Sequence, residues 1–305
     1  MGCWGPGLYS DDFAEDLRPV ICAVCKLPKD TSELVDIIKE TEPRAANDAN
    51  DEDHTTFWLV LADQFHKKGI PYPEVFERAV EIIDNGSDLK MAAELGLEAG
   101  DLRKREAMLA KLRENISEPV VEKPRKTLKK PQPLIMETGD VIVYPVADEW
   151  AELQKNPMYK GHYDLCPANP YFSRTDLEES GWKPVDWGAA VIVDCGLAFG
   201  FLAWYRPLVV SRRLNANLRP SLDDLFAADK WGFEHAGTCS SSHSKKMGLE
   251  KIASVGIISE RLKEIPRGLL DGVGAATIDR SISNCLSITD TAEHEFLRLG
   301  EVVTL

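Results

Sequence analysis

The chain has 305 residues, of which 44% are hydrophobic and 28% are charged, and it carries a net charge of −14. These values are typical of a globular protein, argue against disorder, and at this length predict two domains. Because excess negative charge repels phosphate backbones and anionic lipid, we expect a basic protein as partner, no nucleic acid and no membrane, unless the charge only keeps the chain in solution.

The chain has seven cysteines, which is an odd number, and most of them lie in apolar runs. This indicates reduced thiols and no disulfide framework. The opening residues, MGCWGPGLYSDD, lack a basic region and a long apolar stretch, so no signal peptide is expected. The longest apolar runs, on either side of Asp194, are too short to span a bilayer. The sequence therefore predicts a cytoplasmic protein.

Residues 1–118 predict an all-helical domain. Ser10 or Asp11 can cap a first helix that runs to about Lys26, with Pro19 either inside this helix or at its start. Further helices are expected from Thr31 or Ser32 to about Thr41, over HTTFWLVLADQFHKKG, over EVFERAVEIIDNG, and from about Leu102 to Ile116. The HTTFWLVLADQFHKKG helix is expected to be amphipathic, and the aromatic and aliphatic stripes indicate core packing.

Residues 1–60 hold 13 acids and 5 bases, a net charge of −8 in one fifth of the chain. The densest part is a polar loop, in which the acids are Asp48, Asp51, Glu52 and Asp53. We predict that these four residues bind the partner, because complementary charge speeds encounter with a basic protein and fixes register. The alternative is a solvated turn.

Residues 119–133, PVVEKPRKTLKKPQP, contain five basic residues, one acid and four prolines, which predicts an extended linker. Two interpretations remain open. The linker is either a solvated tether or a segment that touches an acidic partner or the acidic N-terminal face.

From Leu134 the pattern becomes strand-like, so residues 134–305 predict a β-rich domain, a bent sheet or small barrel with a long loop insertion, and the chain an α+β fold. LIMETGDVIVYPV predicts two strands around a turn at Gly139-Asp140. WGAAVIVDCGLAFGFLAWYRPLVV predicts two more, with the turn near Cys195-Gly196. Further strands are expected near residues 253–259 and 275–281, and short helices near residues 221–226 and 292–300.

Two cysteine motifs are candidates for chemistry. Cys22 and Cys25 form a CxxC pair, but one pair supplies only two of the four ligands of a structural zinc, and a buried helix face explains the spacing. His162, Asp164 and Cys166 alternate along an extended segment and can serve a metal or a thiol hydrolase. No oxyanion-hole signature accompanies them, so we assign no catalytic residue, metal or cofactor.

The segment GTCSSSHSKKMG, residues 237–248, is rich in glycine and serine and carries two lysines. It does not match the phosphate loop GxxxxGK[ST]. We expect a mobile surface loop, with anion binding as the alternative.

The opening MGCWGPGLYSDDFAEDL is followed in order by FWLVLADQFHKKG, VFERAVEIIDNGSDL and DLRKREAMLAKLRENI. With these segments, residues 1–118 resemble the bacterial domain-of-unknown-function 4259 family. Trp4, Gly5, Gly7 and Asp12 lie on the family pattern MGxWGxG and the acidic turn after it. We expect Trp4 to pack against the Trp58 helix and the glycines to allow a tight entry turn, so the motif has an architectural role.

GDVIVYPV, WGAAVIV and FGFLAWY give residues 134–305 a more distant resemblance to β-rich immunity proteins of bacterial polymorphic-toxin systems. The two resemblances imply an association with toxin loci. The expected function is therefore an immunity or inhibitor protein that occludes a toxin or effector. The alternatives are a structural or adaptor subunit of a defence-type assembly, and a hydrolase-like enzyme with its site in the β-rich domain.

Overall fold

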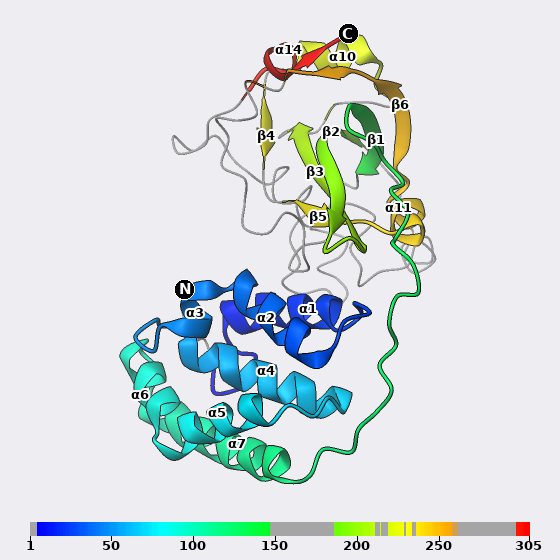
Figure 1. The fold of residues 1–305 in the computed structure, drawn as a ribbon. Coiled ribbons are helices and arrows are strands. Elements are labelled where there is room, and N and C mark those ends of the chain that lie inside the picture. Colours follow the sequence, from blue (N-terminus) through cyan, green and yellow to red (C-terminus); the bar gives the residue numbers. More distant parts are fainter. Residues whose placement is uncertain are drawn as a thin grey trace, which may run out of the picture. The chain divides into compact units, whose positions relative to one another are not determined.

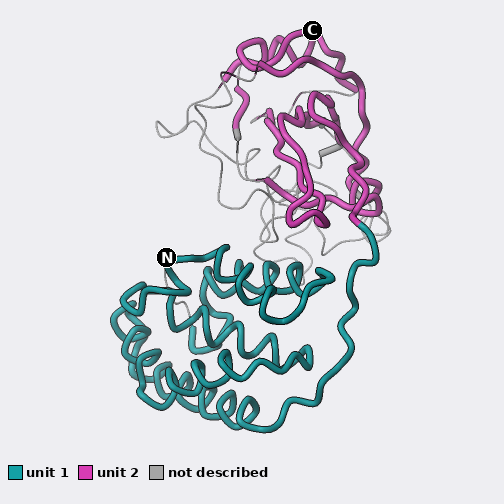
Figure 2. The backbone as a smooth tube through the Cα atoms, in the orientation of Figure 1, with its two compact units in different colours: residues 1–130 teal, residues 131–305 magenta. Residues whose placement is uncertain are grey.

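The computed structural model describes residues 5–146, 186–210, 214, 219–228, 230–233, 236–258, 260 and 297–305. The chain divides into two compact units, residues 1–130 (unit 1) and 131–305 (unit 2), so the division falls inside the expected linker (Figure 2). Unit 1 is helical and unit 2 is built on an antiparallel sheet (Figure 1). The expected α+β class is confirmed.

The helices of unit 1 follow local capping signals. They are α1 (Asp12–Val24), α2 (Thr31–Thr41), α3 (Pro43–Asn47), α4 (His54–Lys68), α5 (Pro73–Asp84), α6 (Ser87–Glu94) and α7 (Ala99–Ser117). Asp11 caps α1, where its Oδ1 accepts from the Ala14 amide at 3.1 Å, and α1 continues through Pro19. Asp30 caps α2, one residue earlier than expected, in a capping box with Glu33. The short helices α3 and α6 were not expected.

The helix α4 is the centre of unit 1, and it is buried on more sides than the amphipathic helix that its sequence predicts. It packs against α1, α3, α5, α6 and α7 (Figure 1). Its buried side chains include Phe57, Leu61 and Phe65, and they lie on all sides of the helix. It ends at Gly69, which has a φ of 65°, after a basic last turn.

Residues 119–130 lie against the helices of unit 1. The Lys123 amide donates to the Gly69 carbonyl at 3.0 Å, and the Leu128 amide donates to the Lys26 carbonyl at 2.8 Å. This part of the linker is therefore held by backbone carbonyl groups of the helical unit, whereas the sequence predicts either a solvated tether or contact with an acidic surface.

The main sheet of unit 2 has the strand order β4-β3-β2-β1-β6, with β5 beside β3, and every pairing is antiparallel. Its strands are β1 (Asp140–Val146), β2 (Asp186–Ala198), β3 (Leu202–Val210), β4 (Trp231–Phe233), β5 (Gly237–Thr238) and β6 (Glu250–Ser254). A second sheet pairs β7 (Gly256–Ile257) with β8 (Val303–Thr304). The described helices of unit 2 are α10 (Leu222–Ala227), α11 (Ser241–Met247) and α14 (Leu299–Val302).

Both faces of the main sheet are buried, which explains why β1 and β2 are almost continuously apolar. Ile142, Tyr144 and Ile192 lie on one face, in a cluster with Met247 of α11. The alternate side chains of the same strands lie on the other face, in a cluster that includes Leu225 of α10.

Two strand predictions are wrong in detail. The β2–β3 turn lies at Phe199 and Gly200, with φ values of 51° and 73°, and not at Cys195-Gly196. Positive φ at both central residues is the pattern of a type I′ turn, whose twist suits a hairpin. Residues 134–139 form no strand, since their described contacts are irregular, such as the bond from the Ile135 amide to the Tyr205 hydroxyl at 2.8 Å.

The segment of residues 237–248 is not a loop. It forms β5 and then α11, which Ser240 caps by accepting from the His243 amide at 3.2 Å and which ends at Gly248 with a φ of 63°. The expectation of a surface loop is therefore wrong. The strand expected at residues 275–281, and His162, Asp164 and Cys166, lie outside the described residues.

Gly188 provides a test of the sheet packing. A Cβ there would lie 2.5 Å from Cζ and 2.7 Å from the hydroxyl oxygen of Tyr144, whose side chain is fully buried. We expect Gly188→Ala to destabilise unit 2 by about 1–3 kcal/mol through overpacking, measured by denaturant unfolding. The control is Gly300→Ala in α14, where no atom lies within 4 Å of the added Cβ. Equal stability of the two variants would contradict this packing.

Candidate functional site

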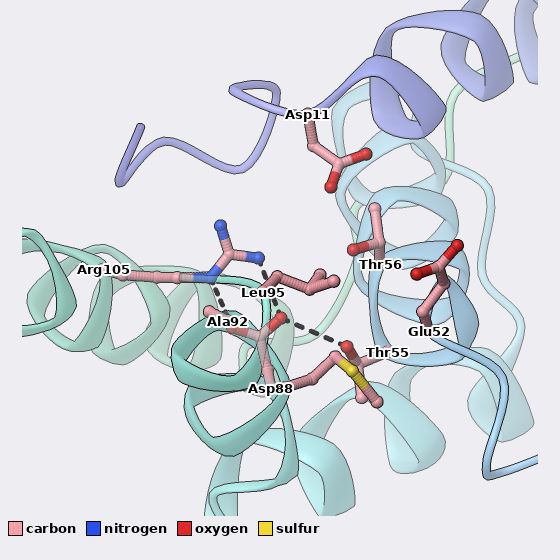
Figure 3. Close-up of a pocket in the computed structure, with 9 residues that line it drawn as sticks. Asp11, Glu52, Thr55, Thr56, Asp88, Ala92, Leu95 and Arg105 are labelled. Carbon is pink, nitrogen blue, oxygen red and sulfur yellow. Dashed lines mark hydrogen bonds and ion pairs between the residues drawn. The ribbon is translucent and has the colours of Figure 1, made fainter. Parts of the chain in front are cut away.

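A buried ion pair lies at one end of unit 1. Arg105 of α7 and Asp88 of α6 are each only 2% exposed. Two parallel bonds join them, Nε to Oδ1 at 2.6 Å and Nη2 to Oδ2 at 2.9 Å (Figure 3). This bidentate geometry is the strongest form of such a pair, and it offsets part of the cost of removing both charges from water.

The ion pair also makes hydrogen bonds to the segment that precedes α1 and to helix α4. Arg105 Nη1 donates to the Gly7 carbonyl at 3.3 Å, and the Thr55 hydroxyl of α4 donates to Asp88 Oδ2 at 3.4 Å. Gly7 also accepts from the Ser10 amide at 3.0 Å, and a Cβ on Gly7 would lie 2.8 Å from the Ser10 hydroxyl. The glycine therefore permits the tight turn that carries its carbonyl to Arg105.

A small pocket of about 10 Å³ opens beside this pair (Figure 3). The charged and hydroxyl side chains that line it are Asp11, Glu52, Thr55, Thr56, Asp88 and Arg105. This volume holds about one water molecule and no substrate.

The predicted partner-binding residues lie in the loop between α3 and α4, but they are not equally available. Asp48 and Glu52 are exposed, and Asp53 is half-buried. Asp51 is 8% exposed, and its carboxylate pairs with Arg44 at 3.0 Å and accepts from the Asp53 amide at 3.1 Å. The four residues therefore lie in one loop, but the carboxylate of Asp51 is already paired within unit 1.

Asp53 stands at the start of α4, where its side chain makes no capping hydrogen bond. Burial raises its pKa to about 7, and the neighbouring carboxylates act in the same direction; they are Asp11, Glu52, Asp51 and Glu42. These five residues are called the acidic cluster below. Asp53 therefore keeps its proton to a much higher pH than a free aspartate does, because both desolvation and like charge disfavour its ionised form.

Glu42, between α2 and α3, experiences the same environment. Burial raises its pKa, and the charges of Asp16 and Asp51 add to the effect. The acidic cluster therefore gathers carboxylates from the start of α1, the α2–α3 junction and the loop before α4. No group of three or more histidine, cysteine or acidic side chains among the described residues is arranged to hold a metal ion.

Sequence reasoning missed Asp11, Glu42, Asp88 and Arg105 as members of this end. A signal was present for two of them. Arg105 lies on the buried stripe of α7 with Leu109 and Leu112, and Asp88 precedes the buried Ala92 by one turn of α6. A charged residue in an apolar stripe indicates a buried ion pair.

The other motifs do not form a site among the described residues. Cys25 ends α1 in the core, where burial raises the pKa of its thiol to about 11 and keeps the thiol protonated. Cys22 is half-buried, with its thiol 3.7 Å from the side-chain oxygen of Gln64. Gly5 is buried and Asp12 is exposed in the first turn of α1, whereas Trp4 lies outside the described residues.

Comparison with known proteins gives no match: no family model, no curated protein and no solved structure matches the chain. Within the part of the chain that the structure describes, no helix has both the length and the apolar character needed to cross a membrane.

The acidic cluster predicts an unusual dependence of stability on pH. Because the folded state raises the pKa of Asp53 from 3.8 to about 7, it binds this proton more tightly than the unfolded chain does. Stability therefore falls as pH rises from about 4 to about 7, and the full penalty persists above that window. We expect Asp53→Asn to raise the denaturation midpoint at about pH 8 and to leave it nearly unchanged at about pH 4.

The control for this test is Asp36→Asn, which removes one exposed carboxylate of α2 outside the acidic cluster. If Asp53→Asn and Asp36→Asn show the same pH profile, the acidic cluster does not destabilise the folded unit.

The ion pair predicts a large loss on removal of one partner. Arg105→Met leaves Asp88 buried and unpaired, so we expect unit 1 to lose about 3–5 kcal/mol in denaturant unfolding. The double variant Arg105→Met with Asp88→Leu should recover part of this loss, since no isolated charge remains. A loss below about 1 kcal/mol for the single variant would show that the pair is not desolvated as described.

Proposed function

We propose that this protein is a bacterial immunity or inhibitor protein that works in the cytoplasm. It binds a basic protein toxin or effector through the acidic end of unit 1 and thereby occludes it. The observation that carries this proposal is the acidic cluster, in which Asp53 is kept half-buried beside other carboxylates.

An arrangement of this kind lowers the stability of the free protein. Side chains with strongly perturbed pKa values occur preferentially at functional sites, and proteins keep such groups where function needs them. A lysine or arginine of a partner, placed beside Asp53, would supply a charge opposite to that of the carboxylates around it. The destabilisation in the free protein would then become a gain in the complex.

The wider charge distribution supports the same partner. The loop before α4 lies near the start of α1, since the charge of Asp11 contributes to the raised pKa of Asp53. Asp48 and Glu52 of the loop, and Asp12 at the start of α1, are all exposed. A toxin that acts on RNA or DNA is basic where it holds phosphates, so an acidic inhibitor attracts it and competes for that surface.

We also propose that residues 1–118 belong to the domain-of-unknown-function 4259 family and that residues 134–305 are related to β-rich immunity proteins. These resemblances favour a toxin locus as the setting. The described architecture is compatible with such a role, because unit 1 carries exposed acidic residues such as Asp48 and Glu52 in the loop before α4.

The test is a comparison of three forms of the full chain as baits in the cell of origin. The variant Asp48→Lys with Glu52→Lys reverses the exposed charge of the loop. The control, Glu74→Lys with Glu77→Lys, makes the same change of charge on exposed positions of α5. We expect the wild type and the control to retain a stoichiometric basic protein at moderate salt.

The loop variant should associate with that protein about tenfold more slowly or worse, with a flatter dependence on salt, measured by surface plasmon resonance. Production of the captured protein alone should then arrest growth, and the wild-type chain should restore it. Equal binding by the loop variant would contradict this interface, and a harmless partner would contradict the inhibitor role.

A further inference from the structure

After α7 the chain crosses unit 1 as an extended segment, residues 119–130, which is called the strap below (Figure 1). Two backbone hydrogen bonds hold it, one to Gly69 after α4 and one to Lys26 after α1. The strap thus spans two separate turns of the helical unit. It is an ordered part of unit 1, although its sequence is rich in proline and lysine.

Arg125 is the main side-chain contact of the strap. Its Nη1 donates to the carbonyls of Cys25 at 3.3 Å and Leu27 at 3.4 Å, and its Nη2 donates to the Lys29 carbonyl. These acceptors lie at and just beyond the C-terminal end of α1, where carbonyl groups lack helical partners and a cation is favoured. One guanidinium therefore satisfies three carbonyls of a neighbouring turn.

Gly69 leaves room for the other end of the strap. A Cβ on Gly69 would lie 2.7 Å from the Val121 carbonyl oxygen and 2.8 Å from Lys123 Cγ. A glycine is therefore required at position 69 for two reasons. The backbone has a φ of 65°, and the strap approaches too closely to leave room for a Cβ. The strap and the α4–α5 turn fit each other specifically.

The strap nevertheless buries little apolar surface. Val120, Arg125 and Leu128 are half-buried, whereas its other residues are exposed, and Val121 is 77% exposed. Segments held by a few polar contacts and little apolar burial open locally at a small fraction of the global unfolding free energy. Such contacts favour local opening of the strap without unfolding of the helices.

The strap determines how much chain is free between the two units. Its last backbone hydrogen bond to unit 1 is at Leu128, and the chain is held again at Gln132, whose amide donates to the Phe201 carbonyl at 2.9 Å in unit 2. Residues 129–131 remain between these points. Their maximum span is roughly 10 Å, whereas release of the strap would free residues 118–131, with a maximum span of roughly 50 Å.

We propose that the strap is a releasable device, latched by Arg125, that switches the tether between the two units from short to long. This inference goes beyond the proposed function and does not depend on it. A short tether limits the arrangements in which both units engage one partner, and a long tether changes the effective concentration of one unit near the target of the other.

The test is hydrogen exchange on the full chain at the resolution of single amides. In Arg125→Ala we expect the amides of Lys123 and Leu128 to exchange about tenfold faster or more, because the latch no longer opposes local opening. The amides of α4 should keep their protection. Lys126→Ala, an exposed neighbour on the same strap, should behave as the wild type does.

A second pair of variants tests the strap without touching Arg125. Gly69→Asn retains a residue that tolerates positive φ but places a Cβ against the strap. Its control is Gly86→Asn, where φ is 72° and no atom lies within 4 Å of the added Cβ. We expect Gly69→Asn alone to raise exchange at Lys123 and to broaden the distance distribution of the full chain in X-ray scattering.

Three results would overturn the proposal. Wild-type amides of Lys123 and Leu128 that exchange at the unprotected rate would show that the strap does not form. Unchanged protection in Arg125→Ala would show that Arg125 is not a latch. Loss of α4 protection together with the strap would show that the strap cannot open separately.

Discussion

The bidentate pair between Arg105 and Asp88 is the interaction on which the acidic end of unit 1 depends. It joins α6 to α7. It also accepts a hydrogen bond from the Thr55 hydroxyl of α4 and donates one to the Gly7 carbonyl in the segment before α1. Two of these elements adjoin carboxylates of the acidic cluster, since Asp11 follows the Gly7 turn at the start of α1 and Asp53 stands at the start of α4. A buried pair of this kind is weak evidence for stability in itself, but once formed it tolerates few alternative arrangements. It therefore ties the segment before Asp11 to the first turn of α4, which Asp53 precedes.

At the same end of unit 1, one carboxylate is paired with a cation, whereas others repel one another. Asp51 is paired with Arg44, whereas burial and neighbouring carboxylates raise the pKa values of Asp53 and Glu42. A unit selected only for stability would neutralise Asp53, since an asparagine of nearly the same shape removes the repulsion. The retention of a carboxylate there is understandable if a cationic partner completes the site.

The sequence is informative where the signals are local and uninformative where they are long-range. Capping residues and hydrophobic periodicity predict the long helices and the α+β class, and charge density locates the loop with Asp48 and Glu52. The pairing of Arg105 with Gly7 joins residues 98 positions apart, which no local pattern reveals. The β2–β3 turn was misplaced because Phe199 is an unusual residue for positive φ, and α11 was missed because its composition resembles that of a loop.

The central claim is that a cationic group of a partner meets the acidic cluster. Calorimetric titration of the captured basic protein into the wild-type chain, in two buffers of different ionisation enthalpy, counts the protons exchanged on binding. Because burial and neighbouring carboxylates raise the pKa of Asp53, a cation beside it lowers that pKa again and releases protons on binding near neutral pH. The account predicts this release and its loss in Asp53→Asn. Binding without proton exchange, or with proton uptake, would contradict it.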